Sequence, residues 1–218
     1  MKKYYITVLL FILITACVFG QSGTIRELTG EVELKRAGTT TFVAASAGDT
    51  VAANTIISTG FRSTAIIAVG NSLITVRPLT RLTLAEIQSA ENTENLNVNL
   101  QAGRVRVDVR PPAGGRSNVS VQSPSATASV RGTSFDMDVD SISVVEGSVI
   151  YSGNAGPAVM VAAGNSSHVE TNGTTADPAV VTASSLAPPA PEGTPAPEMV
   201  SQPTEEATGT LSVTGQYN

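Results

Sequence analysis

The chain has 218 residues, of which 41% are hydrophobic, 4% aromatic and 14% charged, and its formal net charge is −5. This negative balance argues against a nucleic-acid-binding protein, because such proteins usually present a basic face to the phosphates. Scarce aromatic and charged residues, 19 glycines and an apolar content carried largely by Val, Ile, Ala and Leu are typical of an extracytoplasmic protein of many short β-strands.

The N-terminus has the pattern of a secretory signal peptide, which we place at residues 1–20. Two lysines precede an uncharged apolar run that ends at Ala16 and is too short for a comfortable membrane span. Two processing routes remain open: the sequence Ile-Thr-Ala-Cys ending at Cys17 resembles a bacterial lipobox, whereas Gly20 offers an ordinary signal-peptidase site. Because Cys17 is the only cysteine, we expect no internal disulfide, and a lipid on Cys17 is the one membrane attachment expected.

Most of the chain after the signal alternates polar and apolar residues, and this period of two predicts β-strands. Strands are expected at residues 24–28, 31–35, 42–43, 51–58, 63–69, 72–77, 80–85, 96–101, 104–110, 119–121, 126–131, 134–139, 142–145, 148–151, 159–162 and 166–170. The polar segment 86–95 lacks an apolar period and is predicted to be an exposed loop. No window shows the period of a helix. The predicted fold is therefore a single all-β domain, residues 22–170, of mostly antiparallel strands in a sandwich or a short solenoid-like stack.

The stretch from Ala126 to Val139 joins two strand-like runs at Gly132, where we expect a bulge or a sharp bend. After this glycine, apolar residues occupy one face and aspartates the other: Phe135, Met137 and Val139 against Asp136, Asp138 and Asp140. The apolar face, and Phe135 in particular, is expected in the core, and the aspartate face in solvent.

The three aspartates invite a calcium interpretation, which the spacing does not support. An EF-hand loop requires Gly at its sixth position and Glu at its twelfth, where this chain has Ser141 and Gly147. On a strand, alternate carboxylates lie about 7 Å apart, too far to share one ion. His168 is the only histidine and no cysteine follows Cys17, so zinc clusters and Cys/His nucleophilic sites are not expected. We predict no metal, no cofactor and no enzymatic activity.

Arginines provide the other candidate binding residues. Arg104, Arg106 and Arg110 share one strand face, where we expect them to pair with acids on a neighbouring strand, with an anionic glycan or lipid as the alternative. Arg131 is expected to form a structural ion pair if it is buried, because an unpaired buried charge is very costly, and otherwise to recognise a partner. The candidate binding residues are therefore Arg131, Asp136, Asp138, Asp140, Arg104 and Arg106.

The strand pattern fails near the C-terminus, and residues 171–218 are predicted to be a disordered tail. Six of the 12 prolines lie between Leu186 and Thr208, among Ala, Glu, Ser and Thr residues that bury too little apolar surface to offset the entropy of ordering. Residues 211–214 are either part of this tail or a short docking strand. No Lys or Arg follows Arg131, so the C-terminal part is acidic, which serves solubility or offers a surface to a basic partner or a cation.

Several motifs, in their order and spacing, resemble the FecR domain family over roughly residues 30–149. These motifs are Ala47-Gly48-Asp49, Ile56-Ile57-Ser58-Thr59-Gly60, the step from Leu100 through Gly103 to Val105, Val130-Arg131-Gly132-Thr133-Ser134-Phe135, and Glu146-Gly147-Ser148-Val149. The resemblance implies a bacterial extracytoplasmic β-domain with no known catalytic residue.

The family's namesakes are anti-sigma regulators that carry a cytoplasmic domain, cross the inner membrane and sense an iron-siderophore receptor. This sequence shows no such domain and no span after the signal, so it resembles the stand-alone type, secreted or lipid-anchored through Cys17. The function expected from the resemblance is binding of an envelope protein or glycan in the periplasm or at the outer membrane, in signal sensing. The alternative is an architectural envelope or surface protein whose Pro-rich tail serves as a spacer.

Overall fold

The computed structural model describes residues 22–90 and 93–179. The expected signal peptide with Cys17, and residues 180–218 of the expected tail, lie outside this range. Every element named in the described residues is a strand: β1 Ser22–Thr29, β2 Val32–Lys35, β3 Val43–Ala44, β4 Thr50–Ala52, β5 Thr55–Thr59, β6 Thr64–Val69, β7 Ser72–Val76, β8 Arg81–Ala90, β9 Thr93–Ala102, β10 Arg104–Asp108, β11 Arg116–Gln122, β12 Ala126–Val130, β13 Ser134–Asp138, β14 Ser141–Glu146, β15 Ser148–Gly153, β16 Val159–Ala162 and β17 Ser166–His168. The all-β prediction is confirmed. Across these described ranges, no helix is long and apolar enough to span a bilayer.

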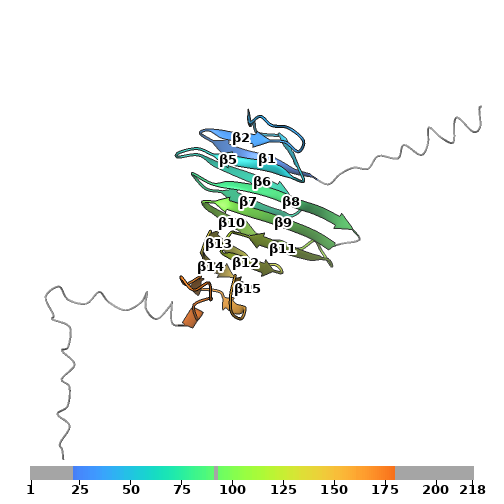
Figure 1. Ribbon diagram of the computed structural model, residues 1–218. Coiled ribbons are helices and arrows are strands. Elements are labelled where there is room, and N and C mark those ends of the chain that lie inside the picture. The colour runs from blue at the N-terminus through green and yellow to red at the C-terminus, as the bar shows by residue number, and fades with distance from the viewer. Residues whose placement is uncertain (1–21, 91–92, 180–218) are drawn as a thin grey trace, which may run out of the picture. The chain divides into compact units, whose positions relative to one another are not determined.

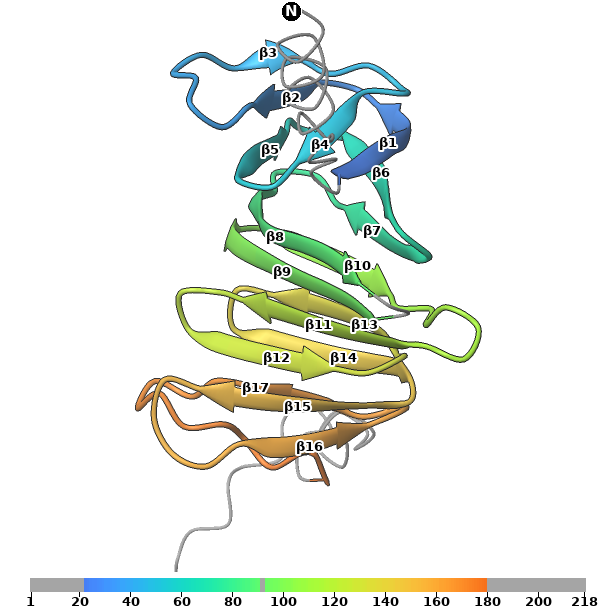
Figure 2. The same ribbon diagram turned by 90° about the vertical axis from the view of Figure 1, so that its right-hand side faces the viewer.

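The strands form two open sheets, in which strands later in the chain lie progressively farther along each sheet. One has eight strands in the order β4-β1-β6-β7-β10-β13-β14-β17, and the other has nine in the order β3-β2-β5-β8-β9-β11-β12-β15-β16. Neighbouring strands are antiparallel apart from the parallel pair β9 and β11. Figures 1 and 2 show the strands stacked from β1–β3 at one end to β15–β17 at the other. The two predicted arrangements therefore describe the same molecule, a two-sheet sandwich built by stacking successive strands.

One apolar core fills the space between the sheets, because alternate residues of nearly every strand point inward. It extends along the whole stack, from Ile25 and Leu34 through Leu82 and Val107 to Tyr151. Phe135 and Met137 are fully buried in it, as the alternation predicted. Val139 departs from that prediction, since β13 ends at Asp138 and the next residue is only half-buried.

Two of the predicted elements were wrong. Residues 51–58 are not one strand: Asn54, with a φ of 62°, turns the chain between β4 of one sheet and β5 of the other. Residues 86–95 are not a loop, since β8 and β9 continue through much of this segment and Ile87 is only 8% exposed. A register shift between Leu84 and Glu86 explains the second error, because a bulge changes the phase of the alternation.

The chain crosses between the sheets at sharp corners, several of which require glycine. Gly103 has a φ of +85°, and a Cβ there would lie 2.6 Å from the carbonyl oxygen of Leu79. Gly147 has a φ of +80°, and a Cβ there would lie 2.6 Å from Cγ2 of Thr133. Gly132, at the crossing from β12 to β13, also has a positive φ of +62°. The bend expected at Gly132 is thus a crossing between the two sheets.

Residues beyond β17 are tied to the end of the stack. The Val169 N–H donates to the Asp140 carbonyl at 2.8 Å, and the Ser167 hydroxyl donates to the Ala176 carbonyl at 2.6 Å. The Ala155 N–H donates to the Gly173 carbonyl at 2.9 Å. The segment 169–176 therefore joins β17 of the eight-stranded sheet to the turn after β15 of the other sheet, and it extends past residue 170.

Candidate binding surface

Six of the charged residues form an arginine–aspartate ladder on the outer face of the eight-stranded sheet. The ladder joins the end of β7 to β10 and β13 and consists of Arg77, Arg104, Arg106, Asp108, Asp136 and Asp138. Arg77 and Arg104 approach Asp136 and Asp138, respectively, to 2.9 Å. Arg106 lies 3.3 Å from Asp108 on its own strand and 3.5 Å from Asp136 on the next. Arg104 and Arg106 thus pair with acids on the neighbouring strand, as expected.

The charges of the ladder are already paired with one another, which favours a structural role for it. Hydrogen bonding to Asp108, followed by its negative charge, raises the pKa of the Arg106 guanidinium. Each arginine in the ladder has a carboxylate partner, and the ion pairs are partly exposed, so each pair contributes only about 0–1 kcal/mol to stability.

Arg110 and Asp140 form none of these ion pairs: Arg110 follows β10, and Asp140 lies exposed in the turn between β13 and β14. In the described part of the chain, no group of three or more His, Cys, Asp or Glu residues could hold a metal ion.

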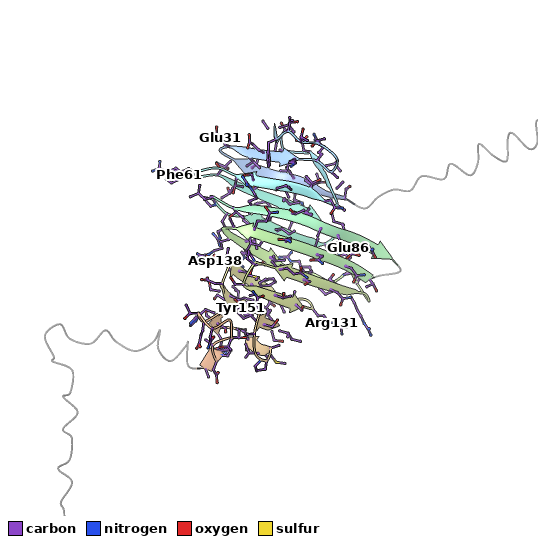
Figure 3. All side chains as sticks on the ribbon, viewed as in Figure 1. Glu31, Phe61, Glu86, Arg131, Asp138 and Tyr151 are labelled. Carbon is purple, nitrogen blue, oxygen red and sulfur yellow. The ribbon has the colours of Figure 1, made fainter. Side chains whose placement is uncertain are left out.

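Arg131 occupies a different face from the other candidates. It follows β12 in the nine-stranded sheet, where its side chain is exposed and its Nε donates to the Asn118 side-chain oxygen at 3.2 Å. The condition for a structural ion pair, burial of Arg131, is therefore not met, and a guanidinium in contact with water needs no counter-charge. Figure 3 shows Arg131 and Glu86 on one side of the domain and Asp138 on the other.

Arg131 borders a groove of about 680 Å³ on the outer face of the nine-stranded sheet. The strand register places one residue from each of six strands in a row across this groove: Glu86, Asn97, Ser120, Ser129, Ile150 and Met160. A second row holds Asn95 and Asn118, whose side-chain amides are bonded to each other at 2.9 Å. The groove therefore runs across the strands, from an acidic residue on β8 to an apolar end on β16.

The groove combines unused polar groups with exposed apolar surface. The Asn97 Oδ1 is buried and has no hydrogen-bond partner among the described residues. At the other end, Ile150 and Met160 face each other across β15 and β16 and are 54% and 69% exposed. Amides and hydroxyls both donate and accept hydrogen bonds, and methionine adapts to irregular apolar surfaces. This arrangement suits non-covalent recognition and presents no nucleophile–base pair.

Only Arg131 among the groove residues was predicted from the sequence. The alternation of Asn97 and Asn99 with apolar residues showed that these side chains face outward, but it gave no reason to prefer them to other polar strand positions. Their grouping depends on the parallel pairing of β9 with β11, which connects residues 93–99 with residues 116–122. Nothing in the alternation within either strand specifies that pairing.

Comparison with known proteins agrees with the motifs. Residues 55–150 match the family described as "FecR protein". Two crystal structures of a "putative anti-sigma factor" from Parabacteroides distasonis ATCC 8503, at 1.65 and 2.50 Å resolution, are similar with TM-scores of 0.46 and 0.44 and 16% identity. Each similarity covers 56% of this chain and 57% of the other, so the chain spans little more than half the length of those structures. No curated protein matches the sequence.

The matched region coincides with the middle of the two-sheet stack. It begins with β5 and ends within β15, and it includes the corners at Gly103, Gly132 and Gly147. These corners carry three of the motifs on which the sequence resemblance was based. The resemblance to the FecR family is therefore confirmed by the match over residues 55–150.

Proposed function

We propose that this chain is a non-enzymatic module of the bacterial envelope that binds a partner protein through the groove of the nine-stranded sheet. The N-terminal signal pattern supports export, to the periplasm or the outer membrane, with Cys17 as the residue for a lipid anchor. The FecR family supports a role in signal sensing. The observation that carries the proposal is the groove itself, with its row of polar groups and its exposed Ile150 and Met160.

A protein fits the groove better than a glycan does. The lining contains no aromatic ring, and its exposed apolar end is aliphatic, which suits Leu, Ile or Val side chains of a partner. Asparagine and serine side chains can bond the N–H and carbonyl groups of an extended segment. The ladder on the opposite sheet is less suited, because its charges already satisfy one another.

Site-specific photo-cross-linking in cells tests this proposal. A photoreactive residue replaces Ser129 in the groove of the tagged full chain, and a matched control replaces Thr75, which faces outward on β7 opposite Arg106. We expect a defined protein adduct from position 129 only, identified by mass spectrometry, and its loss in the Arg131→Glu variant. Equal adducts from both positions, or none from position 129, would reject the groove. Recovery of only peptidoglycan-linked or abundant envelope proteins would instead support the architectural alternative.

A further inference from the structure

β16 leaves one edge of the nine-stranded sheet open. It is the last strand of that sheet, and no other strand pairs with its outer side within residues 22–90 and 93–179. Figure 2 shows it at the end of the stack. The other terminal strands are covered or very short: the Ala176 N–H donates to the His168 carbonyl of β17 at 2.9 Å, and β3 and β4 have only two and three residues. Proteins usually protect sheet edges, because open edges pair with other chains.

The main-chain groups of Met160 point to this open side. At the end of the β15–β16 pair, the Ala163 N–H donates to the Gly147 carbonyl at 2.9 Å. Hydrogen-bonded and non-hydrogen-bonded pairs alternate along antiparallel strands, so Met160, three residues earlier, faces Ile150 in a non-hydrogen-bonded pair. The Met160 N–H and carbonyl are therefore directed away from β15, where no strand of the described chain bonds them.

This end of the sheet carries no charge. No Lys, Arg, Asp or Glu occurs between Gly147 and Val169, and β16 itself reads Val-Met-Val-Ala. When two identical edges pair about a two-fold axis, each residue meets its own kind or a close neighbour, so a charged edge would bring like charges together. The edge at β16 avoids this repulsion, because every residue that contributes to the net charge of −5 lies outside this stretch. The edge is therefore complementary to itself.

We propose that β16 pairs antiparallel with β16 of a second copy of this chain, so that two nine-stranded sheets join edge to edge. Met160 lies on the two-fold axis, where its N–H and carbonyl bond the same groups of the second copy. Ala162 then lies opposite Ala158 of the second copy, and both residues are small and exposed. The Ala162 carbonyl already accepts from the Asn165 N–H at 3.0 Å, and its second lone pair is available to the second copy.

The pairing also joins the two grooves. A two-fold axis perpendicular to the sheets keeps both outer faces on the same side, so the exposed side chains of Met160 and Ile150 meet those of the second copy and form one apolar centre. The polar rows lead away from this centre, each toward its own Glu86. A four-residue edge buries less than the roughly 1,200–2,000 Å² of a standard interface, so the dimer should form reversibly and depend on protein concentration.

Single cysteines test the pairing, because the chain from Gln21 to Asn218 contains none. Met160→Cys places its thiol on the two-fold axis, where the two Cα atoms are about 5.5 Å apart, within the roughly 4.4–6.8 Å that a disulfide spans. The matched control is Phe61→Cys, at a side chain 72% exposed and distant from β16 (Figure 3). Under mild oxidation we expect a disulfide-linked dimer of Met160→Cys at concentrations where Phe61→Cys remains monomeric. Equal yields from the two positions would overturn the proposal.

Sedimentation equilibrium of cysteine-free chains provides the second measurement. We expect a monomer–dimer equilibrium for the wild-type chain and for Met160→Leu. The dimer should be lost in Met160→Lys, which places like charges on the axis, and in Met160→Pro, which removes an N–H that β15 does not use. The circular dichroism of both monomeric variants should match that of the wild type. A wild-type chain that stays monomeric at every concentration, or a dimer that survives Met160→Pro, would overturn the proposal.

This proposal and the proposed function can fail separately. The dimer is measured on the purified chain alone, whereas the adduct from position 129 is identified in cells as a different protein. If Met160→Cys forms its disulfide with another envelope protein in cells and never with itself, a foreign strand occupies the edge and the second copy is rejected.

Discussion

Replacing Gly147 with alanine tests whether the family motifs encode architecture. Its φ of +80° costs an alanine about 1–2 kcal/mol, because L-residues are strained in this region. The new Cβ would also lie 2.6 Å from Cγ2 of Thr133, a side chain only 3% exposed, and forcing a methyl group into a packed interior costs about 1–3 kcal/mol. We therefore expect Gly147→Ala to lower the free energy of unfolding by about 2–5 kcal/mol, measured by urea unfolding followed by circular dichroism.

Two controls isolate the contact with Thr133. Gly114 has a similar φ of +71°, but a Cβ there would have no atom within 4 Å, so Gly114→Ala should cost only about 1–2 kcal/mol. In a Thr133→Ser background, which lacks the Cγ2 methyl, Gly147→Ala should cost about the same as Gly114→Ala. Equal costs for the two glycine substitutions in the wild-type background would refute the packing argument, and an unchanged stability would refute the corner geometry as well.

Three further predictions concern the core and the ladder. Phe135→Ala should cost about 3–5 kcal/mol in the same unfolding assay, whereas Phe61→Ala, at a side chain 72% exposed, should change stability by less than about 0.5 kcal/mol. Asp136→Asn, which removes the carboxylate shared by two arginines, should cost about 1 kcal/mol at low salt and less in 1 M NaCl, and a cost that is independent of salt would contradict ion pairing. Burial, followed by the nearby aspartates, raises the pKa of Tyr151, so stability should fall as pH rises above about 10, where the unfolded chain loses this proton and the folded chain keeps it. Tyr151→Phe should remove that fall and raise stability at pH 7 by about 1 kcal/mol, since the buried hydroxyl has no hydrogen-bond partner among the described residues.

Strand positions could be predicted from alternation wherever the phase stays constant. The alternation around Phe135 placed its side chain in the core correctly, because β13 is regular from Ser134 to Asp138. It failed at the bulge between Leu84 and Glu86, where one extra residue moves Ile87 to the buried face. Local periodicity carries no information on such an insertion, because both strand halves look regular by themselves.

Which residues are neighbours across two strands was harder to predict than which side chains point inward or outward. Pairing of Arg104 and Arg106 with aspartates could be expected because β10 and β13 both expose charges of opposite sign. The groove could not be predicted in this way. Its row of residues comes from six strands, and the register of those strands is set by core packing and by corner geometry. Arg131 was singled out for its place in a motif, and its exposure beside Asn118 became clear only with the position of β12 in the sheet.

The location of the motifs explains why resemblance to the FecR family does not by itself identify a partner. Gly103, Gly132 and Gly147 stand where the chain crosses between sheets, and Phe135 lies in the core between them. These four residues support the stack and are not part of the groove lining. The groove proposed for recognition combines the motif residue Arg131 with outward-facing positions such as Asn97 and Ser129, which belong to no motif but are brought together by the strand register. Substitutions at the corners should lower stability and binding together, whereas substitutions in the groove should change binding alone, and this difference can be measured on one set of purified variants.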